Sequence, residues 1–309
     1  MRPGAIAGCW GALSLAMLGG PAAADPAVFE SPEAAIGAVV SALEARDRAA
    51  LIAVFGPENE DVVLTGDPED DRATWGEFLR DYRALSRINR EGDDLATLVI
   101  GRDLWPFPAP LVRDAAGWHF DADAAREEVL LRRIGQNELD VIDLLRGYVG
   151  AQTAYRALDP DGDGLPAFAA SLLSSEGKRD GLYWPEQADG PESPVGDFMA
   201  RAAAEGYSVE GGTDAEPEPY LGYYYRILTS QGPDAPGGAM DYQVNGHMVA
   251  GHALIAFPAA YGDTGVMSFL VGERGVVYEA DLGDDTLEEA SGIDSFNPGG
   301  GWTPVPEED

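Results

Sequence analysis

Residues 249–257, which carry the sequence Val-Ala-Gly-His-Ala-Leu-Ile-Ala-Phe, decide the fold. An apolar run of this length, bounded by turn-forming residues, predicts a β-strand. Similar segments recur on both sides of it, and clusters of glycine and proline separate them. We therefore expect an antiparallel β-meander formed by residues 222–228, 241–244, 249–257, 266–271 and 276–280.

Two helices are predicted ahead of the meander, over residues 123–133 and 137–158. The second has an apolar face, because hydrophobic side chains recur in it every three or four residues. An acidic, glycine-containing turn ends this helix, and a third helical stretch is predicted at residues 167–173. We expect the meander to pack on the long helix, whose apolar face comprises Leu139, Ile142, Leu145 and Val149, with Tyr148, Gln152 and Tyr155 nearby.

The chain before these helices has the pattern of a small α+β unit. A helix N-cap at Ser31 is followed by a proline and an acid, and residues 75–82 indicate a further helix. Strand signals follow at residues 95–100, 111–112 and 118–120. Helices followed by antiparallel strands resemble the cone-shaped fold of the nuclear-transport-factor-2-like group. The predicted fold class is therefore α+β.

The first residues have the organisation of a secretory signal. Arg2 precedes an apolar run over residues 5–18, and a group of small residues ends at Ala24. This order predicts that residues 1–24 are a signal peptide and that the protein is exported to the periplasm. The alternative is a lipoprotein attached through Cys9, but the apolar run before that cysteine is too short for a signal core. No later segment has the roughly 18 apolar residues that span a membrane, so no membrane span is expected.

Acidic residues dominate the composition. The chain has 54 Asp and Glu against 20 Lys and Arg, and a net charge of -34. A chain with so few cations, among which Lys178 is the only lysine, cannot neutralise a row of phosphates, so we exclude nucleic acid as a partner. The predicted organisation is a signal peptide (1–24), an N-terminal α+β domain (25–122), long helices with a C-terminal α+β domain (123–283) and an acidic tail (284–309).

Four motifs carry a resemblance to a bacterial family. They are Gly-Lys-Arg-Asp-Gly-Leu-Tyr-Trp-Pro at residues 177–185, Gly-Tyr-Tyr-Tyr-Arg-Ile-Leu-Thr at 222–229, Gln-Gly-Pro at 231–233 and Tyr-Gly-Asp-Thr-Gly-Val-Met at 261–267. In this combination the chain resembles the domain-of-unknown-function 2950 family over nearly all of its length after the signal. The resemblance implies an exported protein and supplies no chemistry.

The C-terminal part is similar to the globular heads of type IV pilin-like proteins. The similarity rests on Gln152 and Tyr155 in a helix, on the Asp-Gly turn, and on a meander that contains Gly222, Pro258 and Gly265. The chain differs from true pilins because a signal peptide and another domain stand in place of the N-terminal membrane helix. The resemblance implies a soluble relative that does not polymerise through a stalk.

Asp159, Asp161 and Asp163, followed by Gly164, reproduce the first half of a calcium-binding EF-hand loop. Carboxylates at alternate positions can converge on Ca²⁺, and the glycine permits the sharp turn. The twelfth position is Ala170, not the glutamate that completes such a site. Two interpretations stay open: a weak Ca²⁺ site, or an acidic turn whose side chains bind local amides. No other cofactor is expected.

A second candidate site is a glycine-bounded loop in which a basic pair adjoins an acid and two aromatic residues. Cations supply directed donors and rings supply contact area, so this loop can bind an anionic or sugar ligand. The alternative is that the aromatic pair belongs to the core under the loop and the arginine pairs with an acid. The candidate residues are Lys178, Arg179, Asp180, Tyr183 and Trp184.

No catalytic constellation is recognisable in the sequence. It has no Gly-x-Ser-x-Gly elbow, no phosphate-binding glycine loop and no zinc motif around its three histidines. We therefore assign no catalytic residues and expect a non-catalytic exported protein that binds an envelope protein or glycan. The alternative is a carboxylate-dependent hydrolase acting on envelope glycan or peptide. So acidic a chain always contains carboxylate pairs, and their presence does not discriminate between the two functions.

Overall fold

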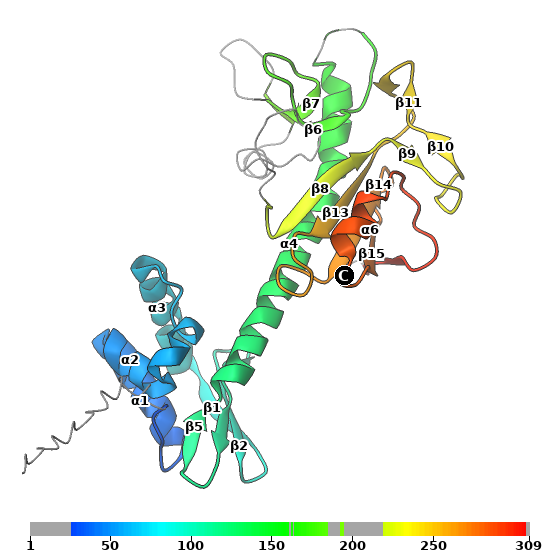
Figure 1. The fold of residues 1–309 in the computed structure, drawn as a ribbon. Helices are drawn as coiled ribbons and strands as arrows, with labels where there is room; N and C mark the ends of the chain where they lie inside the picture. Colours follow the sequence, from blue (N-terminus) through cyan, green and yellow to red (C-terminus); the bar gives the residue numbers. More distant parts are fainter. Residues whose placement is uncertain (1–25, 161, 163, 185–191, 195–218, 307–309) are drawn as a thin grey trace, which may run out of the picture. The chain divides into compact units, whose positions relative to one another are not determined.

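The computed structural model describes residues 26–160, 162, 164–184, 192–194 and 219–306. The predicted signal peptide lies outside the described residues. The chain divides into two compact units, Met1–Val129 and Leu130–Asp309. Both units contain helices and antiparallel sheets, so the predicted α+β class is confirmed (Figure 1).

Capping side chains determine where the helices of the first unit begin. Ser31 Oγ accepts a hydrogen bond from Ala34 N at 3.2 Å, which confirms the predicted N-cap. Asp47 and Asp67 cap the next two α-helices in the same way. The helical elements are α1 (Pro32–Ala45), α2 (Arg48–Phe55), the 3₁₀ helix η1 (Pro57–Val62) and α3 (Pro68–Ala84).

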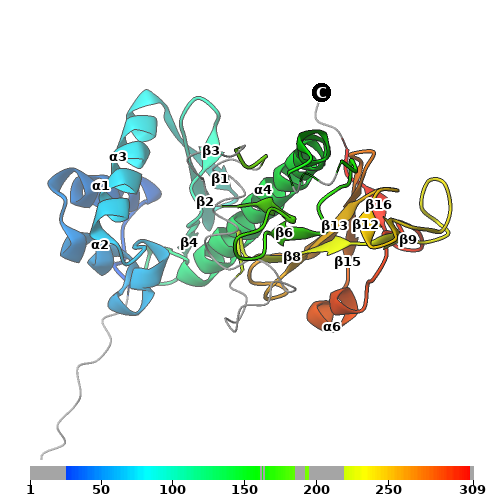
Figure 2. The same cartoon turned by 90° about the horizontal axis from the view of Figure 1, so that it is seen from above.

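An antiparallel sheet completes the first unit. Its strands lie in the order β1-β2-β4-β5, and β3 pairs with β2. Trp118 and Phe120 are buried while His119 between them is partly exposed, as the alternation of a strand predicts. Figure 2 shows α1, α2 and α3 on one side of this sheet. The strands are β1 (Ser86–Glu91), β2 (Leu95–Ile100), β3 (Trp105–Pro106), β4 (Leu111–Arg113) and β5 (Trp118–Phe120).

Helix α4 (Ala122–Leu158) is continuous, whereas the sequence predicted two helices. The predicted break lies near Gly135, but one glycine costs a helix interior only about 1 kcal/mol relative to alanine, so the helix continues through it. The buried face of α4 is centred on Leu144, Leu145 and Tyr148. Leu139 is 54% exposed, so its assignment to this face is wrong. None of the described helices, α4 included, combines the length and apolarity that crossing a bilayer requires.

The predicted meander is confirmed as the main sheet of the second unit. Its strands lie in the order β16-β15-β14-β13-β8, and every neighbouring pair is antiparallel. All six residues of β13 are buried. The sheet lies between α4 and the short helix α6 (Thr286–Ser291) (Figures 1 and 2). The strands are β8 (Tyr223–Leu228), β13 (Ala253–Pro258), β14 (Met267–Gly272), β15 (Val277–Asp281) and β16 (Thr303–Pro304).

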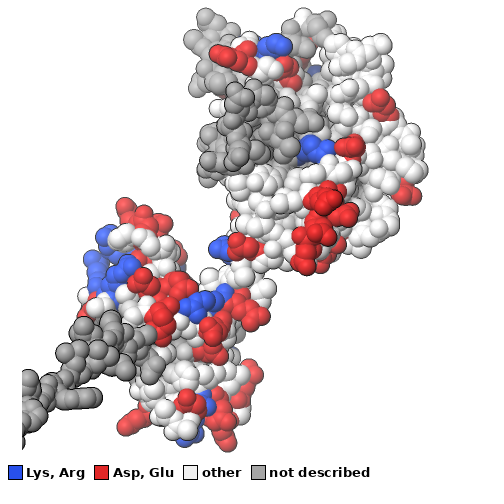
Figure 3. Space-filling view, viewed as in Figure 1, with Lys and Arg blue, Asp and Glu red and all other residues white. Residues whose placement is uncertain are grey.

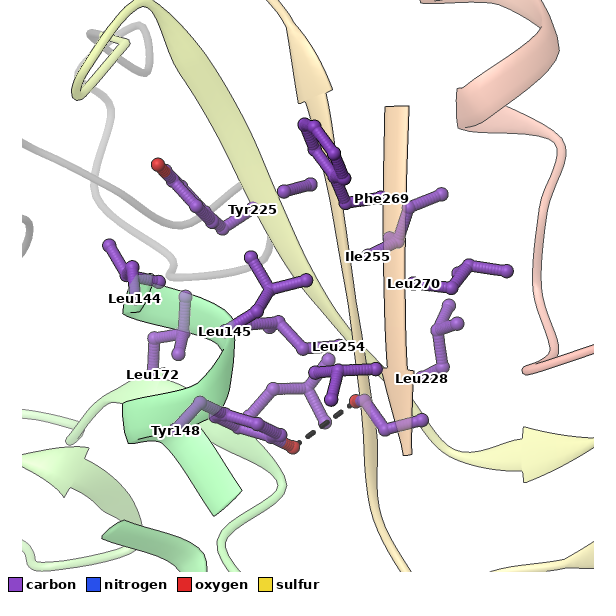
Figure 4. Close-up of a cluster of buried hydrophobic side chains, with 14 of the residues drawn as sticks. Leu144, Leu145, Tyr148, Leu172, Tyr225, Leu228, Leu254, Ile255, Phe269 and Leu270 are labelled. Carbon is purple, nitrogen blue, oxygen red and sulfur yellow. Dashed lines mark hydrogen bonds between the residues drawn. The ribbon is translucent and has the colours of Figure 1, made fainter. Parts of the chain in front are cut away.

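Side chains from α4 fill the space against this sheet. Figure 4 shows Leu144, Leu145 and Tyr148 turned toward β8 and β13. The Tyr148 hydroxyl donates a hydrogen bond to the carbonyl oxygen of Ala253 at 3.2 Å, which ties the helix to the first residue of β13. Gln152, one turn further along α4, is also fully buried and donates to the Tyr148 hydroxyl and to Ala169 O. The side-chain polar groups of Tyr148 and Gln152 are therefore satisfied by each other and by the backbone.

Shorter strands form three separate two-stranded sheets among the described residues. The predicted strand at residues 241–244 is divided between two of these sheets. Residues 171–173, predicted as helical, form β6 and pair in parallel with β7, because strand pairing overrides local helix propensity. These strands are β6 (Ser171–Leu173), β7 (Gly181–Tyr183), β9 (Ser230–Gln231), β10 (Met240–Asp241), β11 (Gln243–Val244) and β12 (His247–Met248).

The predicted acidic tail is a folded part of the second unit, which corrects that expectation. Residues 284–306 contain α6 and β16, and Ala290 and Phe296 are buried. The segment is rich in acids, but its few apolar residues are enough to pack it against the sheet. Arg226 of β8 fixes the end of α6: its Nη2 donates to the carbonyl oxygens of Ala290 and Ile293 at 2.9 Å and 2.8 Å.

Replacing Arg226 should therefore release α6 from the sheet. Only 13% of the Arg226 side chain is exposed, and its substitution leaves several backbone carbonyls without a partner. We expect Arg226→Met to lower the free energy of unfolding by about 2 kcal/mol, measured by urea denaturation. Arg274→Met, at an exposed turn, should change it by less than about 0.5 kcal/mol. Equal effects of the two substitutions would contradict this role of Arg226.

Candidate functional site

The predicted ligand loop at residues 178–184 comprises the end of the connection between β6 and β7, strand β7 itself and Trp184. Asp180 is held by Ser175, whose backbone N and Oγ donate to its carboxylate at 2.7 Å and 3.0 Å. Lys178 Nζ lies 3.7 Å from Asp180 Oδ2. Partial burial raises the pKa of Asp180, but the hydrogen bonds from Ser175 outweigh it and hold that pKa below its ordinary value. Asp180 is therefore an ionised residue that stabilises the loop.

The aromatic part of this loop lies inside the protein. Trp184 is 2% exposed, and its ring meets that of Tyr155 edge-on, with 6.3 Å between centroids. The Arg179 guanidinium lies over the Trp184 ring at 6.0 Å, and the Tyr155 hydroxyl donates to Arg179 O at 2.8 Å. Tyr183 is partly exposed. The five candidate residues do come together, but the ring expected to contact a ligand is covered by the protein itself.

The candidate calcium loop follows the end of α4. Asp161 and Asp163 lie outside the described residues. Asp159 has a left-handed backbone (φ 46°), and its Oδ2 accepts a hydrogen bond from Gly164 N at 3.1 Å. This contact is that of an acidic turn which binds a local amide. No group of three or more metal-ligating side chains occurs among the residues that the structure describes, and Ca²⁺ binding stays a prediction.

The first unit contains a cavity that was not predicted from the sequence. Its volume is about 520 Å³, and its wall is formed by α1, α2, α3, β2 and the segment after β2. Most of the side chains that line it are aliphatic or aromatic. They are Val39, Leu43, Leu51, Phe55, Val62, Val63, Thr74, Trp75, Glu77, Phe78, Asp81, Ile100, Asp103, Trp105, Phe107, Pro108, Ala109 and Val129.

Helix α3 places aromatic side chains at this cavity. Trp75 and Phe78 lie three residues apart on one face of α3 and are only partly buried, whereas the neighbouring Leu79 is buried in the core. The Phe78 ring meets the Phe107 ring edge-on at 5.5 Å, so the helix and the segment after β3 share one aromatic wall. Trp105 is 47% exposed and completes the rim. The cavity therefore has an apolar interior and an aromatic edge.

Three carboxylates and no basic side chain line the cavity. Glu77 and Asp81 are one turn apart on α3, and Asp103 follows β2. Asp81 forms an ion pair with Arg80, whose side chain is 66% exposed. Within the described ranges the side chains of Glu77 and Asp103 have no hydrogen bond and no ion pair. The cavity edge is therefore electrically negative, and a cation can approach Glu77 and Asp103 without breaking an ion pair.

The fold and this cavity define the chain as an α+β protein with an apolar, acid-edged pocket. It matches the family described as Protein of unknown function (DUF2950) over residues 26–305 and belongs to that family. The resemblance carried by the four sequence motifs is confirmed. No curated protein and no solved structure matches the chain. The likenesses of its parts to the nuclear-transport-factor-2-like cone and to pilin-like heads stay predictions.

The sequence motifs contain glycines that allow close packing in this structure. Gly265 lies against Tyr223, and a Cβ at this glycine would overlap the tyrosine hydroxyl. Gly222 is equally close to Thr264, since an added Cβ would lie 2.6 Å from the threonine Cβ. Glu138 of α4 joins the same region, because its Oε1 accepts from the backbone N of both Val266 and Met267 at 2.9 Å. These motif residues thus fasten the loop before β14 to β8 and α4.

Glycine substitutions test this structural role. At Gly265 and Gly181 an added Cβ would overlap, respectively, the Tyr223 hydroxyl and the Leu173 carbonyl, whereas at Gly135 of α4 it would meet nothing within 4 Å. We expect Gly265→Ala and Gly181→Ala each to destabilise the fold by about 2 kcal/mol. Gly135→Ala should be neutral or stabilise by up to about 1 kcal/mol. Thermal melting of the three variants checks this, and equal midpoints would contradict it.

His252 is a buried titratable residue outside any predicted site. It is fully buried, and neither ring nitrogen has a hydrogen-bond partner in the described part of the chain. The rings of Phe168 and Tyr148 meet it edge-on at 4.6 Å and 5.2 Å. Burial, and secondarily the charge of Arg156, lowers the pKa of His252 from 6.5 to about 4. His252 is therefore neutral in the folded protein at neutral pH.

This depressed pKa predicts a loss of stability in acid. Because the unfolded chain binds a proton at His252 below about pH 6.5 and the folded chain does not, stability is complete above that pH and falls down to about pH 4. Between these values wild type should lose up to about 3 kcal/mol more than His252→Leu. His119→Gln should retain the wild-type dependence. Urea denaturation across this pH range measures the effect, and parallel curves for wild type and His252→Leu would contradict it.

Proposed function

We propose that this protein is an exported, non-catalytic binding protein of the cell envelope, and that the cavity of its first unit receives an apolar group of the ligand. The cavity carries the proposal. Its volume of about 520 Å³ lies within the range of small-molecule sites, which are concave, mostly apolar and bordered by a few polar groups. The signal-like residues 1–24 support export.

The lining of the cavity favours a ligand with a flexible chain or a flat ring. Aliphatic side chains such as Leu43, Leu51 and Ile100 form part of the wall, and aromatic ones such as Phe55 and Phe107 offer broad contact area. Each methylene that a ligand buries contributes about 0.8 kcal/mol. A chain of moderate length can therefore bind through apolar contact alone, without a reaction.

The loop at residues 178–184 is not the ligand-binding site in this proposal. Trp184 and Asp180 are engaged in packing and in hydrogen bonds within the loop, so they support a structural role better than the ligand-binding role expected from the sequence. An envelope protein or glycan stays our expectation for a partner of the second unit. The hydrolase alternative predicts chemical change in the ligand, which the experiment below detects.

A neutral apolar dye such as N-phenyl-1-naphthylamine tests the cavity. We expect saturable binding with one dye per chain and a rise in its fluorescence. Val129→Trp places a bulky side chain at a position that lines the cavity and is 42% exposed, so it should weaken binding at least about tenfold by filling the space. Leu131→Trp is the matched control, because Leu131 is also exposed on α4 but does not line the cavity.

Two outcomes would contradict the proposal. One is a failure of the dye test: either wild type does not bind the dye saturably, or wild type and Val129→Trp bind it with equal affinity although thermal melting shows that both are folded. The other is conversion of the ligand: after incubation with isolated envelope material, mass spectrometry should recover bound molecules unchanged, and a product that forms only with the protein would support the hydrolase instead.

A further inference from the structure

We propose that the occupant of this cavity is an amphipathic cation, with an apolar chain or ring inside and a positively charged head at Glu77, Asp81 and Asp103. This inference rests on the proposed function and names the class of its ligand. Three observations support it: three carboxylates and no basic side chain line the cavity, two of these carboxylates form no ion pair among the described residues, and aromatic rings line the same cavity.

The backbone brings the carboxylates to one side of the cavity. Glu77 and Asp81 are four residues apart on α3, so their side chains are neighbours on that helix. Asp81 O accepts a hydrogen bond from Gly101 N at 3.2 Å, and Gly101 leaves room for Asp81 because a Cβ there would lie 3.6 Å from the Asp81 Cβ. Asp103 is two residues further along the same turn, and all three acids line the cavity.

Four arginines of the first unit form ion pairs with acids that do not line the cavity. Ion pairs connect Arg90 with Glu33, Arg83 with Glu44, Arg126 with Asp61 and Arg48 with Asp71. Arg80 forms an ion pair with Asp81 that raises the pKa of Arg80, and the charge of Glu77 raises that pKa as well. On the face that Figure 3 shows, basic side chains likewise lie among acidic ones. Glu77 and Asp103 are therefore acids at an apolar cavity that form no ion pair of their own among the described residues.

This arrangement discriminates between ligand heads. Like charges one helical turn apart repel, and a cation placed between Glu77, Asp81 and Asp103 relieves that repulsion. The rings of Trp75 and Trp105 at the same cavity attract a cation through their faces, as they would not attract an anion. An anionic head is repelled by all three carboxylates. A neutral head is attracted neither by the carboxylates nor by the ring faces, so a ligand that carries it binds through its apolar part alone.

Three amphiphiles with the same decyl chain test this inference on the full chain: decyltrimethylammonium, decyl maltoside and decyl sulfate, each used below its micelle concentration. Displacement of N-phenyl-1-naphthylamine gives the affinities. We expect the cation to bind at least about tenfold more tightly than the maltoside, and the sulfate to bind most weakly. The preference for the cation should shrink as salt is raised, because the carboxylates are accessible to solvent ions.

Charge-removing variants separate the local effect from the net charge of the protein. Glu77→Gln/Asp81→Asn/Asp103→Asn should abolish the cation preference and leave maltoside affinity unchanged. The matched control, Glu91→Gln/Asp93→Asn/Asp94→Asn, removes the same charge at the turn between β1 and β2 and should keep the preference. If the cavity triple variant does not fold, Glu77→Gln/Asp103→Asn retains the Arg80–Asp81 pair and should still reduce the preference at least about threefold.

The possible results are distinguishable. Equal affinity for the cation and the maltoside would overturn the inference and leave the proposed function standing. Equal loss of preference in the cavity variant and in the control would also overturn it, because the preference would then reflect only net charge. If no amphiphile and no dye binds to the folded protein, both the inference and the proposed function fail.

Discussion

The contact between α4 and the buried strand β13 is the interaction on which the second unit depends. All six residues of β13 are buried, and Leu144, Leu145 and Tyr148 of α4 pack toward this strand and β8. Because β13 is paired on both edges, it fixes the positions of β8 and β14 and, through them, of the outer strands. The close glycine contacts at residues 222 and 265 then hold the neighbouring loop against the same core.

The first unit uses apolar side chains differently, because some of them line a pocket that is partly open to solvent. Protein cores are normally packed as densely as organic crystals, so side chains that line a pocket of about 520 Å³ lack contacts that a filled core would give them. Partly exposed aromatic residues and three acids lie at the same place, and the acids repel one another. A bound amphiphile restores the missing contacts and neutralises the charge, which gives these features a common explanation.

The sequence predicted the elements better than the site. Strong local signals, such as those of β8 and β13, were confirmed because local pattern and tertiary packing agree in them, whereas α4 is one helix where two were predicted. Residues 171–173 and residues 284–306 were misjudged because pairing and packing with other segments decide their structure. The cavity was missed for a related reason: Trp75 and Phe78 mark an apolar helix face, but a sequence does not show whether another side chain fills the space beside that face. Likewise, the aromatic residues near residue 184 could belong to a site or to the core, and only the fold decides.

The most direct measurement of the central claim is a methyl NMR titration of the full chain with decyltrimethylammonium. Val, Leu and Ile methyl groups report on both units at once. The account predicts that shifts concentrate on cavity residues such as Val39, Leu43 and Ile100, while Leu254 and Ile255 of β13 stay unchanged and serve as internal controls. Saturable shifts confined to the second unit, or no shifts at all, would contradict the claim that the cavity of the first unit is the binding site.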